Sequence, residues 1–550
     1  MSALVLAASE EYSPWVKHLD YPDLAIWQLL ERTANRFPDR PALRFFGRQT
    51  TYRALMDLVE RFARGLAALG VKPGDRVALV LPNAPQMVIG YYGTLRAGAV
   101  VVPTNPLYTP REFAVQMRDC EPQVILALDL VIPRLRDAAQ GATLVSTRIR
   151  DYLPPVLGLL QGMRERGPEL PSDIMTLDRL LAMDQGGDLP PAAGADEVAV
   201  LQYTGGTTGV PKAAMLSHRN LVANALQAEA WMPSYQPGSE RVLAVLPFFH
   251  VFGMTVALNL GILTGAEIDL VPRFNPAETA KEVRRFKPTL FPGAPAMYQA
   301  VTDSPHVEKW NIRSIRYCIS GSAPLPAELQ ARFERMTGGV LVEGYGLTEA
   351  SPVTHCNPLA GDRRTGTVGR PFPDTEQRIL DPEDPAQELG PGEVGELAVK
   401  GPQVMLGYYN QPAETSAVLE DGWLRTGDLA TIDKDGFCRI VDRKKDVIIV
   451  SGFNVYPREV EEVLLRHPGV HEAVVVGVPD ERRGQLVRAV VVPWPDRRPT
   501  EEELGAYCRE RLAGYKTPRQ FELRDELPRT AIGKVLRRVL VAEALEKKEE

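Results

Sequence analysis

Short apolar, β-branched runs alternate with amphipathic stretches along the N-terminal half of the chain. Apolar residues recur at helical spacing over residues 51–69, and Gly70 supplies a helix stop. The apolar run 77–81 predicts a strand, and a second helix over 86–96 leads into another strand candidate at 99–102. Because strands that alternate with helices pair in parallel and are covered on both faces, this pattern predicts an α/β fold with mostly parallel sheets.

The alternation continues and then changes twice. Later strands are predicted at the apolar runs 198–202, 242–246, 268–271, 289–291 and 315–319. Residues 366–440 hold short strand-like pieces with frequent Gly, Pro and Asp, which indicates a small β-rich subdomain. Beyond Asp442, a basic cluster precedes a compact α+β pattern. We therefore expect a large N-terminal domain at residues 1–442, including the β-rich subdomain, and an α+β C-terminal domain at 443–550.

Composition argues against several classes of protein. The 63 basic and 70 acidic side chains give a net charge of −7 without a long run of one sign, so bulk charge predicts no nucleic-acid partner. The five cysteines are far apart and form no C-x-x-C pair, which argues against a disulfide framework or zinc site and favours a reducing cytoplasm. The N-terminal sequence has no basic n-region, so we expect no secretory signal.

One stretch has the length of a membrane span. Residues 242–266 are uncharged, and about 20 apolar residues suffice to cross a bilayer as a helix. Pro247, His250, Asn259 and three glycines interrupt this stretch. We therefore expect buried strand, loop and helix there instead.

The segment YTGGTTGVPKAAMLSH at residues 203–218 carries the clearest chemical information. It follows a predicted strand and places three glycines and three threonines ahead of Lys212. Glycines let backbone N–H groups approach an anion, hydroxyls donate, and the lysine adds positive charge, so the segment suits a polyphosphate. Pro211 and Ala213 flank the lysine, which excludes the common P-loop pattern. A flexible surface turn would have a similar composition.

Further motifs follow in one order along the chain. They are LPFFHVFG at 246–253, SGSAPL at 320–325, EGYGLTEASP at 343–352, GELAVKGPQVMLGYYNQP at 395–412, GWLRTGDLA at 422–430, VDRKKDVIIVSGFNVYPREVE at 441–461 and LPRTAIGKVLRR at 527–538. With the glycine-rich segment, they make the chain resemble the acyl-adenylate-forming superfamily, which includes acyl-CoA synthetases, peptide-synthetase adenylation domains and firefly-type luciferases. Two residues depart from the superfamily loop, because Gly205 replaces its usual Ser and Ala213 its usual Gly.

The resemblance implies a nucleotide site. Tyr345 would stack on adenine, Asp428 would bind the ribose hydroxyls with help from Arg443, and Thr348 would bind the α-phosphate. Glu349 and Thr208 would hold Mg²⁺, since a hard cation prefers oxygen ligands. The implied ATP- and AMP-binding residues are Thr204, Gly205, Gly206, Thr207, Thr208, Gly209, Lys212, Gly321, Ser322, Ala323, Gly344, Tyr345, Gly346, Thr348, Asp428 and Arg443.

The resemblance also implies a catalytic set. Lys534 would place its ammonium between the attacking carboxylate and the α-phosphate and stabilise the anionic transition state. The other members are Thr348, Glu349 and His250. An acyl pocket is expected at Phe248, Phe249, His250 and Met254.

A moving C-terminal domain is a further implication. The superfamily's hinge position is Lys445, and rotation there would replace the Lys534 face by a CoA-binding loop at Ser451, Gly452 and Phe453. Gly452 would leave room for a pantetheine arm. A basic linker that does not move is the alternative.

The resemblance implies a cytoplasmic acyl-CoA synthetase that uses ATP, Mg²⁺ and coenzyme A. The motif wording is most like bacterial medium- and long-chain fatty-acid CoA ligases. The alternatives are an aryl-CoA ligase such as a 4-coumarate type, an adenylation domain that loads a carrier protein, and a catalytically dead nucleotide-binding protein. Phe249-His250 stands where amino-acid-activating domains carry Phe-Asp, and Lys534 and Glu349 argue against lost catalysis. Expected partners are the fatty acid, ATP and CoA, with no nucleic acid; peripheral association with the inner face of the membrane and homodimerisation are left open.

Overall fold

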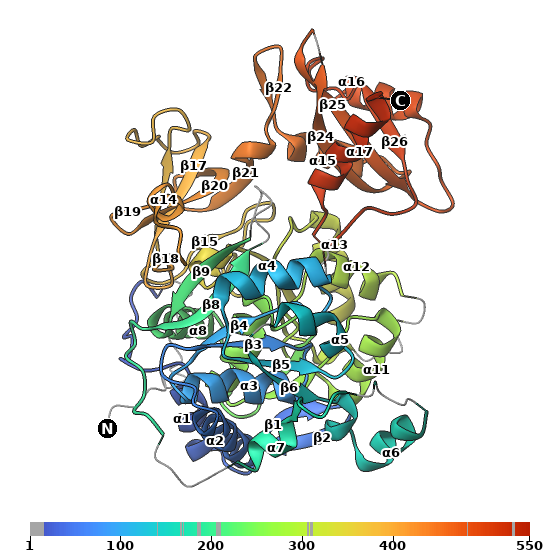
Figure 1. The fold of residues 1–550 in the computed structure, drawn as a ribbon. Helices are drawn as coiled ribbons and strands as arrows, with labels where there is room; N and C mark the ends of the chain where they lie inside the picture. The colour runs from blue at the N-terminus through green and yellow to red at the C-terminus, as the bar shows by residue number, and fades with distance from the viewer. Residues whose placement is uncertain are drawn as a thin grey trace. The chain divides into compact units, whose positions relative to one another are not determined.

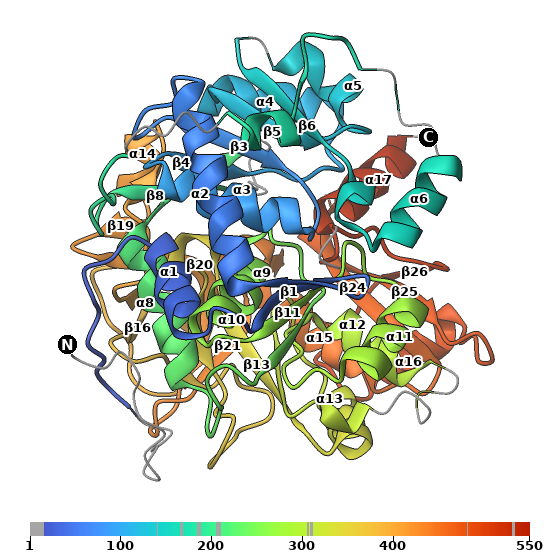
Figure 2. The same cartoon turned by 90° about the horizontal axis from the view of Figure 1, so that it is seen from below.

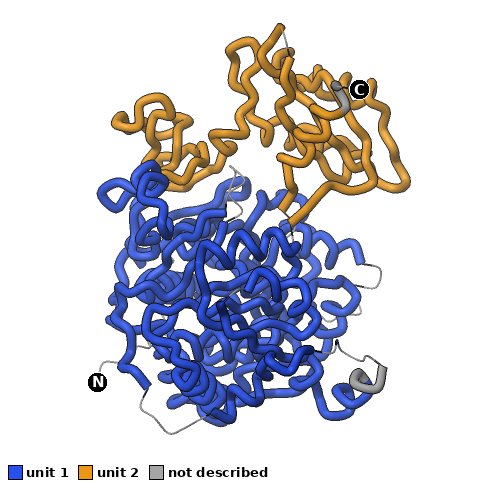
Figure 3. Tube along the Cα trace, in the orientation of Figure 1, with its two compact units in different colours: residues 1–376, 400–424 blue, residues 377–399, 425–550 orange. Residues whose placement is uncertain are grey.

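A computed structural model describes most of the chain as two compact units. The described residues are 16–139, 141–164, 168, 170–183, 189–204, 211–304, 307, 312–480, 482–530 and 534–549. Unit 1 comprises residues 1–376 and 400–424, and unit 2 comprises residues 377–399 and 425–550 (Figure 3). This division by contacts joins part of the β-rich segment to the C-terminal residues. The functional boundary near Asp442 stays a prediction.

The largest sheet among the described residues of unit 1 has eight strands in the order β18-β9-β8-β4-β3-β5-β6-β7 (Figure 1). The strands are β3 (Arg76–Val80), β4 (Val100–Pro103), β5 (Val124–Leu128), β6 (Thr143–Thr147), β7 (Met175–Thr176), β8 (Val198–Thr204), β9 (Lys212–Ser217) and β18 (Gly407–Tyr408). Strands β3 to β8 pair in parallel, whereas β9 is antiparallel to β8 and to β18. The predicted α/β fold with mostly parallel strands is confirmed.

Side-chain caps begin several helices of unit 1. Thr51 accepts a hydrogen bond from the backbone N–H of Ala54 at the start of α2, and Thr109 with Glu112 forms a capping box at the start of α4. The α-helices are α1 (Trp27–Arg36), α2 (Tyr52–Ala68), α3 (Pro85–Arg96), α4 (Pro110–Cys120), α5 (Ile132–Leu135), α6 (Pro155–Arg164), α7 (Leu177–Leu181), α8 (His218–Ala230), α9 (Val251–Gly253), α10 (Leu260–Leu263), α11 (Pro276–Phe286), α12 (Pro295–Thr302), α13 (Ala327–Thr337) and α14 (Pro412–Ser416). The 3₁₀ turns are η1 (Arg136–Ala138), η2 (Ile149–Tyr152), η5 (Ile312–Ser314) and η6 (Thr348–Ala350).

Helices cover both faces of the large sheet. α2 and α3 lie on one face, and α4 and α5 lie on the other (Figure 2). Ala78 and Val80 of β3 share a buried cluster with Phe113 of α4. Leu79 points the opposite way and packs on Gly90 of α3, where an added Cβ would come within 2.9 Å of the leucine. Because successive strand residues face opposite sides, a strand buried on both faces must be apolar throughout, as the run 77–81 is.

Two smaller sheets complete unit 1. One has the order β10-β11-β1-β2 and the other β12-β13-β14-β15. Their strands are β1 (Pro41–Phe45), β2 (Arg48–Thr51), β10 (Arg241–Ala244), β11 (Glu267–Leu270), β12 (Tyr317–Ser320), β13 (Val340–Gly346), β14 (Val353–Cys356) and β15 (Arg370–Pro371). The strand predicted at 289–291 is wrong, because only Leu290 bridges Val242 and Tyr317 there. Pro288 and Pro292 bracket it, and proline cannot donate to a strand ladder.

The uncharged stretch 242–266 folds as expected into strand, loop and helix. β10 leads into α9, a π-helical turn η3 (Met254–Asn259) and α10. Asn259 lies buried in the π-helical turn, where its side-chain oxygen accepts a hydrogen bond from Tyr92. Within the described part of the chain, no helix has the length and apolarity needed to cross a membrane.

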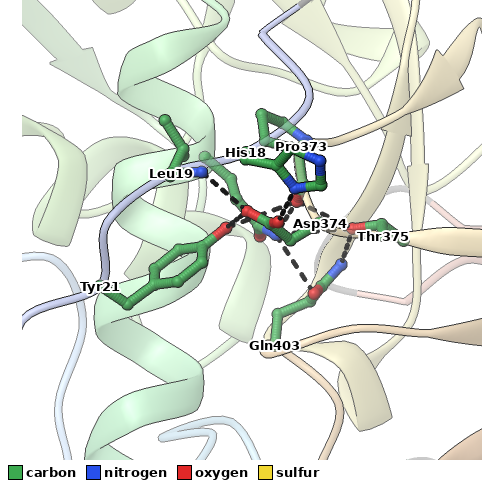
Figure 4. Close-up of polar contacts among 8 residues, drawn as sticks. His18, Leu19, Tyr21, Pro373, Asp374, Thr375 and Gln403 are labelled. Carbon is green, nitrogen blue, oxygen red and sulfur yellow. Dashed lines mark hydrogen bonds and ion pairs between the residues drawn. The ribbon is translucent and has the colours of Figure 1, made fainter.

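The N-terminal segment of unit 1 is tied to Asp374 (Figure 4). His18 Nδ1 lies 2.7 Å from Oδ1 of Asp374, while the N–H of Leu19 and the hydroxyl of Tyr21 donate to Oδ2 at 2.9 and 2.8 Å. Gln227 of α8 donates to the carbonyl of Pro373 at 2.6 Å. These bonds fix the backbone just before residue 377, where the chain passes into unit 2.

Unit 2 contains a five-stranded sheet in which β26 is added to the order β23-β22-β25-β24. The strands are β22 (Ile448–Val450), β23 (Phe453–Val455), β24 (Val470–Asp480), β25 (Gly484–Pro493) and β26 (Gln520–Leu523), and the helices are α15 (Pro457–Leu465), α16 (Glu501–Arg509) and α17 (Arg537–Glu549). Val475 packs with Val460 of α15 and Leu504 of α16 on one face. Val474 packs with Leu540 of α17 on the other. The predicted C-terminal α+β pattern is confirmed.

The β-rich segment supplies a second small sheet. Its order is β16-β17-β20-β19, and β21 also pairs with β20. The strands are β16 (Glu376–Leu380), β17 (Gly395–Lys400), β19 (Leu419–Glu420), β20 (Trp423–Ile432) and β21 (Cys438–Arg443), and the 3₁₀ turn η7 (Lys444–Asp446) follows.

All five cysteines of the chain are buried, free thiols.

Candidate active site

The predicted phosphate loop connects β8 and β9. β8 ends at Thr204 and β9 begins at Lys212, and the antiparallel register places these two residues opposite each other. The sheet therefore fixes both ends of the loop. The predicted site residues between them, Gly205, Gly206, Thr207, Thr208 and Gly209, lie outside the described residues.

Tyr408 of β18 contacts both Lys212 and Glu349. The ammonium of Lys212 lies 5.2 Å from the centroid of the Tyr408 ring and forms an ion pair with Glu414 of α14. The hydroxyl of Tyr408 donates to Oε1 of Glu349 at 2.7 Å. Burial and the charge of Glu349 raise the pKa of the Tyr408 phenol, so the hydroxyl keeps its proton. The structure thus brings a predicted phosphate-binding lysine next to a predicted Mg²⁺ ligand.

The motif EGYGLTEASP forms the end of β13 and the turn η6. Tyr345 pairs with His355 across the sheet, and their ring centroids are 6.0 Å apart. An added Cβ at Gly346 would lie 2.0 Å from the carbonyl oxygen of Pro352, so only glycine fits this position. Thr348 and Glu349 follow directly in η6. The close backbone approach therefore places both polar side chains at the end of the strand.

The motif SGSAPL begins at the end of the neighbouring strand. β12 and β13 are parallel, with Ser320 opposite Glu343. Gly321 follows the end of β12, whereas Gly344 continues in β13 and pairs with Cys356 of β14. Gly321 packs against the Phe252 ring, and Ser322 has a φ of +70°. Ala323 is exposed. Ligands of parallel sheets bind at the carboxyl ends of the strands, where this motif begins.

The acyl-pocket residues lie where β10 passes into α9. Phe248 and Met254 are fully buried, whereas Phe249 and His250 are partly exposed. Nδ1 of His250 accepts a hydrogen bond from the N–H of Phe252 at 3.3 Å and so caps α9. Met254 begins the π-helical turn, an uncommon element that often marks a functional site.

Two buried amides that the sequence did not indicate hold this loop. Asn83 donates to the carbonyls of Ala244 and Leu246 at 2.9 and 2.8 Å, and its Oδ1 accepts from the N–H of Phe248 at 2.8 Å. Gln202 of β8 donates to the carbonyl of Phe249 at 3.0 Å. The polar Asn83 after the apolar run 77–81 and Pro82 was the only available signal, because these contacts join segments far apart in the chain.

In unit 2, Asp428 and Arg443 face each other across β20 and β21. Nε of Arg443 lies 3.4 Å from Oδ1 of Asp428, and the carboxylate is nearly buried. The N–H of Asp428 donates to Oγ1 of Thr426 at 3.2 Å. The predicted ribose-binding pair is thus held as a unit by the sheet.

Lys534 lies within the electrostatic field of this pair. Burial, with the charges of Arg443 and Lys445, lowers its pKa to about 8 against the raising effect of Asp428 and Asp446. Its backbone is fixed to Thr530, which receives a hydrogen bond from the N–H of Lys534 at 3.1 Å and donates to its carbonyl at 2.8 Å. Unit 2 therefore brings together the ribose-binding pair, Lys445 and Lys534.

The predicted CoA loop forms the hairpin between β22 and β23. Ser451 and Gly452 have φ values of +51° and +85°. Phe453 is 56% exposed and stacks on Tyr515, with ring centroids 4.8 Å apart. A pocket of about 190 Å³ lies beside the hairpin and is lined in part by Ser451, Arg483, Tyr515 and Arg519.

Comparison with known proteins identifies the family. The family model described as AMP-binding enzyme matches residues 30–409, and the model described as AMP-binding enzyme C-terminal domain matches residues 459–534. A long-chain-fatty-acid–CoA ligase of Bacillus subtilis (strain 168) is 45% identical over 547 residues, which cover 98% of each chain. A feruloyl-CoA synthase of an Amycolatopsis species is 38% identical over 512 residues, which cover 92% of this chain and 96% of that protein.

Solved structures share the fold. The crystal structure of ATP-bound MatB from Rhodopseudomonas palustris matches with a TM-score of 0.84 and 32% identity, covering 94% of this chain and 98% of that chain. The likeness extends over nearly the whole chain in both comparisons. From these matches and the two family models, we conclude that the chain belongs to the AMP-binding enzyme family.

Proposed function

We propose that this chain is an AMP-forming acyl-CoA ligase that activates long-chain fatty acids. A carboxylate oxygen of the acid attacks the α-phosphorus of ATP, which forms acyl-AMP and releases pyrophosphate. The sulfur of CoA then attacks the acyl carbon, the thiol loses its proton, and AMP leaves. The meeting of Lys212 and Glu349 at Tyr408 carries this proposal, in a chain that is 45% identical to a long-chain-fatty-acid–CoA ligase.

We assign ATP binding to the residues at the ends of β8, β9, β12 and β13. Thr204 and Lys212 would bind phosphate, Thr348 the α-phosphate, and Tyr345 the adenine. The donor set at Glu349 fits Mg²⁺, because one hydrogen bond from Tyr408 leaves lone pairs on the carboxylate oxygens, and Mg²⁺ takes its other ligands from phosphates and water. Bound there, Mg²⁺ would neutralise phosphate charge.

We assign ribose binding to Asp428, and we assign to Lys534 the positive charge that stabilises the adenylation transition state. A carboxylate accepts hydrogen bonds from both ribose hydroxyls, and Asp428 is held in place by its ion pair with Arg443. The ammonium of Lys534 would stabilise the charge that develops when two anions meet. Rotation at Lys445 between the two half-reactions, which makes the C-terminal domain mobile, is part of the proposal.

We assign CoA to the hairpin of Ser451, Gly452 and Phe453 and the adjoining pocket. Among the residues that the structure describes, nothing lies within 4 Å of an added Cβ at Gly452, which leaves space for a narrow arm. Arg483 and Arg519 line the pocket, and guanidinium groups bind phosphate. The exposed stack of Phe453 and Tyr515 offers a flat aromatic surface to an adenine.

An aryl-CoA ligase is the second candidate, and the similarity to feruloyl-CoA synthase favours it. Pyrophosphate release from ATP separates the candidates when it is measured with octanoate, palmitate, oleate and ferulate, with and without CoA, and the thioester is identified by mass. We expect the highest rate with palmitate or oleate and acyl-CoA as product. A maximum with ferulate would replace the fatty-acid assignment by the aryl one, and adenylation without thioester would indicate a carrier-protein ligase.

Association with larger partners also stays a prediction. We place the enzyme in the cytoplasm at the inner face of the membrane. Four side chains of α6 are exposed and apolar, namely Val156, Leu157, Leu159 and Leu160. Flotation with phospholipid vesicles tests membrane association, and sedimentation velocity tests homodimerisation. Protein that does not float with the vesicles would contradict membrane association, and protein that sediments as a monomer would contradict homodimerisation.

A further inference from the structure

Tyr408 contacts both charged groups of the candidate ATP site. It lies in the motif GELAVKGPQVMLGYYNQP at 395–412, for which the sequence predicted no site residue. It occupies the second position of the two-residue strand β18, which pairs antiparallel with β9. Its hydroxyl binds Glu349 at 2.7 Å, and its ring faces the ammonium of Lys212 at 5.2 Å. A tyrosine can make both contacts at once because its ring face attracts cations while its hydroxyl donates.

The position of the Tyr408 side chain is rigid. The residue is 8% exposed, and its N–H donates to Oγ1 of Thr415 at 2.9 Å. Ala214 of β9 lies opposite it in the sheet, two residues from Lys212. The carbonyl of Glu349 is fixed independently, since it accepts a hydrogen bond from the N–H of Met405 at 2.8 Å. Both partners of Tyr408 thus come from anchored backbone.

We propose that Tyr408 is a positioning residue for MgATP: its hydroxyl orients the Glu349 carboxylate toward the metal, and its ring holds Lys212 toward the phosphates. This inference rests on the proposed function. An oriented carboxylate loses less freedom when it binds a cation, and groups that hydrogen-bond to metal ligands commonly contribute about 10- to 100-fold to metal affinity.

Glu414 defines the state of Lys212 before ATP binds. It forms an ion pair with Lys212 and is half exposed, so it satisfies the lysine without enclosing it. The phosphates of ATP carry more negative charge than one carboxylate and can displace it from the ammonium. Tyr408 stays in contact with Lys212 through this exchange because the strand that carries it, β18, pairs with β9, which carries Lys212.

Calorimetric titration of ATP without fatty acid tests the proposal, once with Mg²⁺ and once with EDTA. We expect Tyr408→Phe to weaken MgATP binding about tenfold, because it removes only the hydroxyl. Its affinity for metal-free ATP should stay within twofold of the wild type. Tyr408→Leu also removes the ring, and we expect an added loss that is equal with and without Mg²⁺, because Lys212 contacts phosphate.

Tyr409→Phe is the matched control. It makes the same change one residue along, on a side chain that packs against the apolar cluster beneath α4, and it should leave both affinities unchanged. Equal losses of ATP affinity with and without Mg²⁺ in Tyr408→Phe would reveal a merely structural role, and wild-type affinity for MgATP would refute the proposal outright. A wild type that binds MgATP but makes no acyl-AMP would instead overturn the proposed function and leave the role of Tyr408 in nucleotide binding standing.

Discussion

The lowered pKa of Lys534 predicts an alkaline limit for adenylation. Burial and the cations Arg443 and Lys445 set this pKa at about 8 in the free enzyme. The ammonium is the form that stabilises the transition state, so adenylation is lost as the pH rises through this value. With a pKa of 8, about 90% of Lys534 is charged at pH 7 and about 10% at pH 9, whereas an unperturbed lysine would stay charged to about pH 10.

The assay is pyrophosphate release with palmitate at limiting ATP, between pH 6.5 and 9.5. Under these conditions kcat/KM reports the free enzyme, and we expect it to fall about tenfold per pH unit above the pKa. Lys534→Arg is the control, because a guanidinium stays charged throughout this range. Its rate will be lower, but the alkaline limb should disappear.

Thioester formation from supplied acyl-AMP should show no such limb. This half-reaction consumes a thiolate, so its rate should increase with pH over the same range. A flat profile for pyrophosphate release up to pH 9.5 would refute the argument from burial. An alkaline limb that persists in Lys534→Arg would assign the titration to another group.

The remaining predictions concern two residues. Lys534→Ala should reduce acyl-AMP formation by at least 100-fold while thioester formation from supplied acyl-AMP stays within about threefold, as measured by pyrophosphate release and thioester mass; equal losses would contradict its assigned role. Asn83→Ala leaves the carbonyl of Leu246 and the N–H of Phe248 without their partner, while the carbonyl of Ala244 keeps its bond from Val271, so the free energy of unfolding in urea should fall by about 2–4 kcal/mol. An unchanged urea midpoint would show that Asn83 does not hold the loop.

The sequence predicted helices and strands best where a single hydrophobic periodicity dominated the segment. The helix expected over 51–69 is α2 (Tyr52–Ala68), and the strand expected at 77–81 is β3 (Arg76–Val80). The run 289–291 failed because apolar composition outweighed the prolines on both sides. The local hydrophobic pattern thus predicted most elements. At 289–291 the flanking prolines, which lack a backbone N–H, account for the exception.

The candidate site was predictable only as motifs. Lys212 and Glu349 were expected to bind one ligand, and the structure brings them together in unit 1. Tyr408 and Asn83 escaped prediction because their roles depend on partners far along the chain, and no local spacing reveals such pairs. Motifs indicate which residues react, whereas the groups that hold them in place emerge only from the fold.

Labelled fatty acid tests the central claim most directly. Palmitate with ¹⁸O in both carboxylate oxygens is converted to palmitoyl-CoA in unlabelled water, and AMP and pyrophosphate are analysed by mass. Because the carboxylate oxygen that attacks the α-phosphorus stays on AMP when CoA displaces it, we predict one ¹⁸O in AMP and none in pyrophosphate. Unlabelled AMP, or label in inorganic phosphate together with ADP, would contradict activation through acyl-AMP.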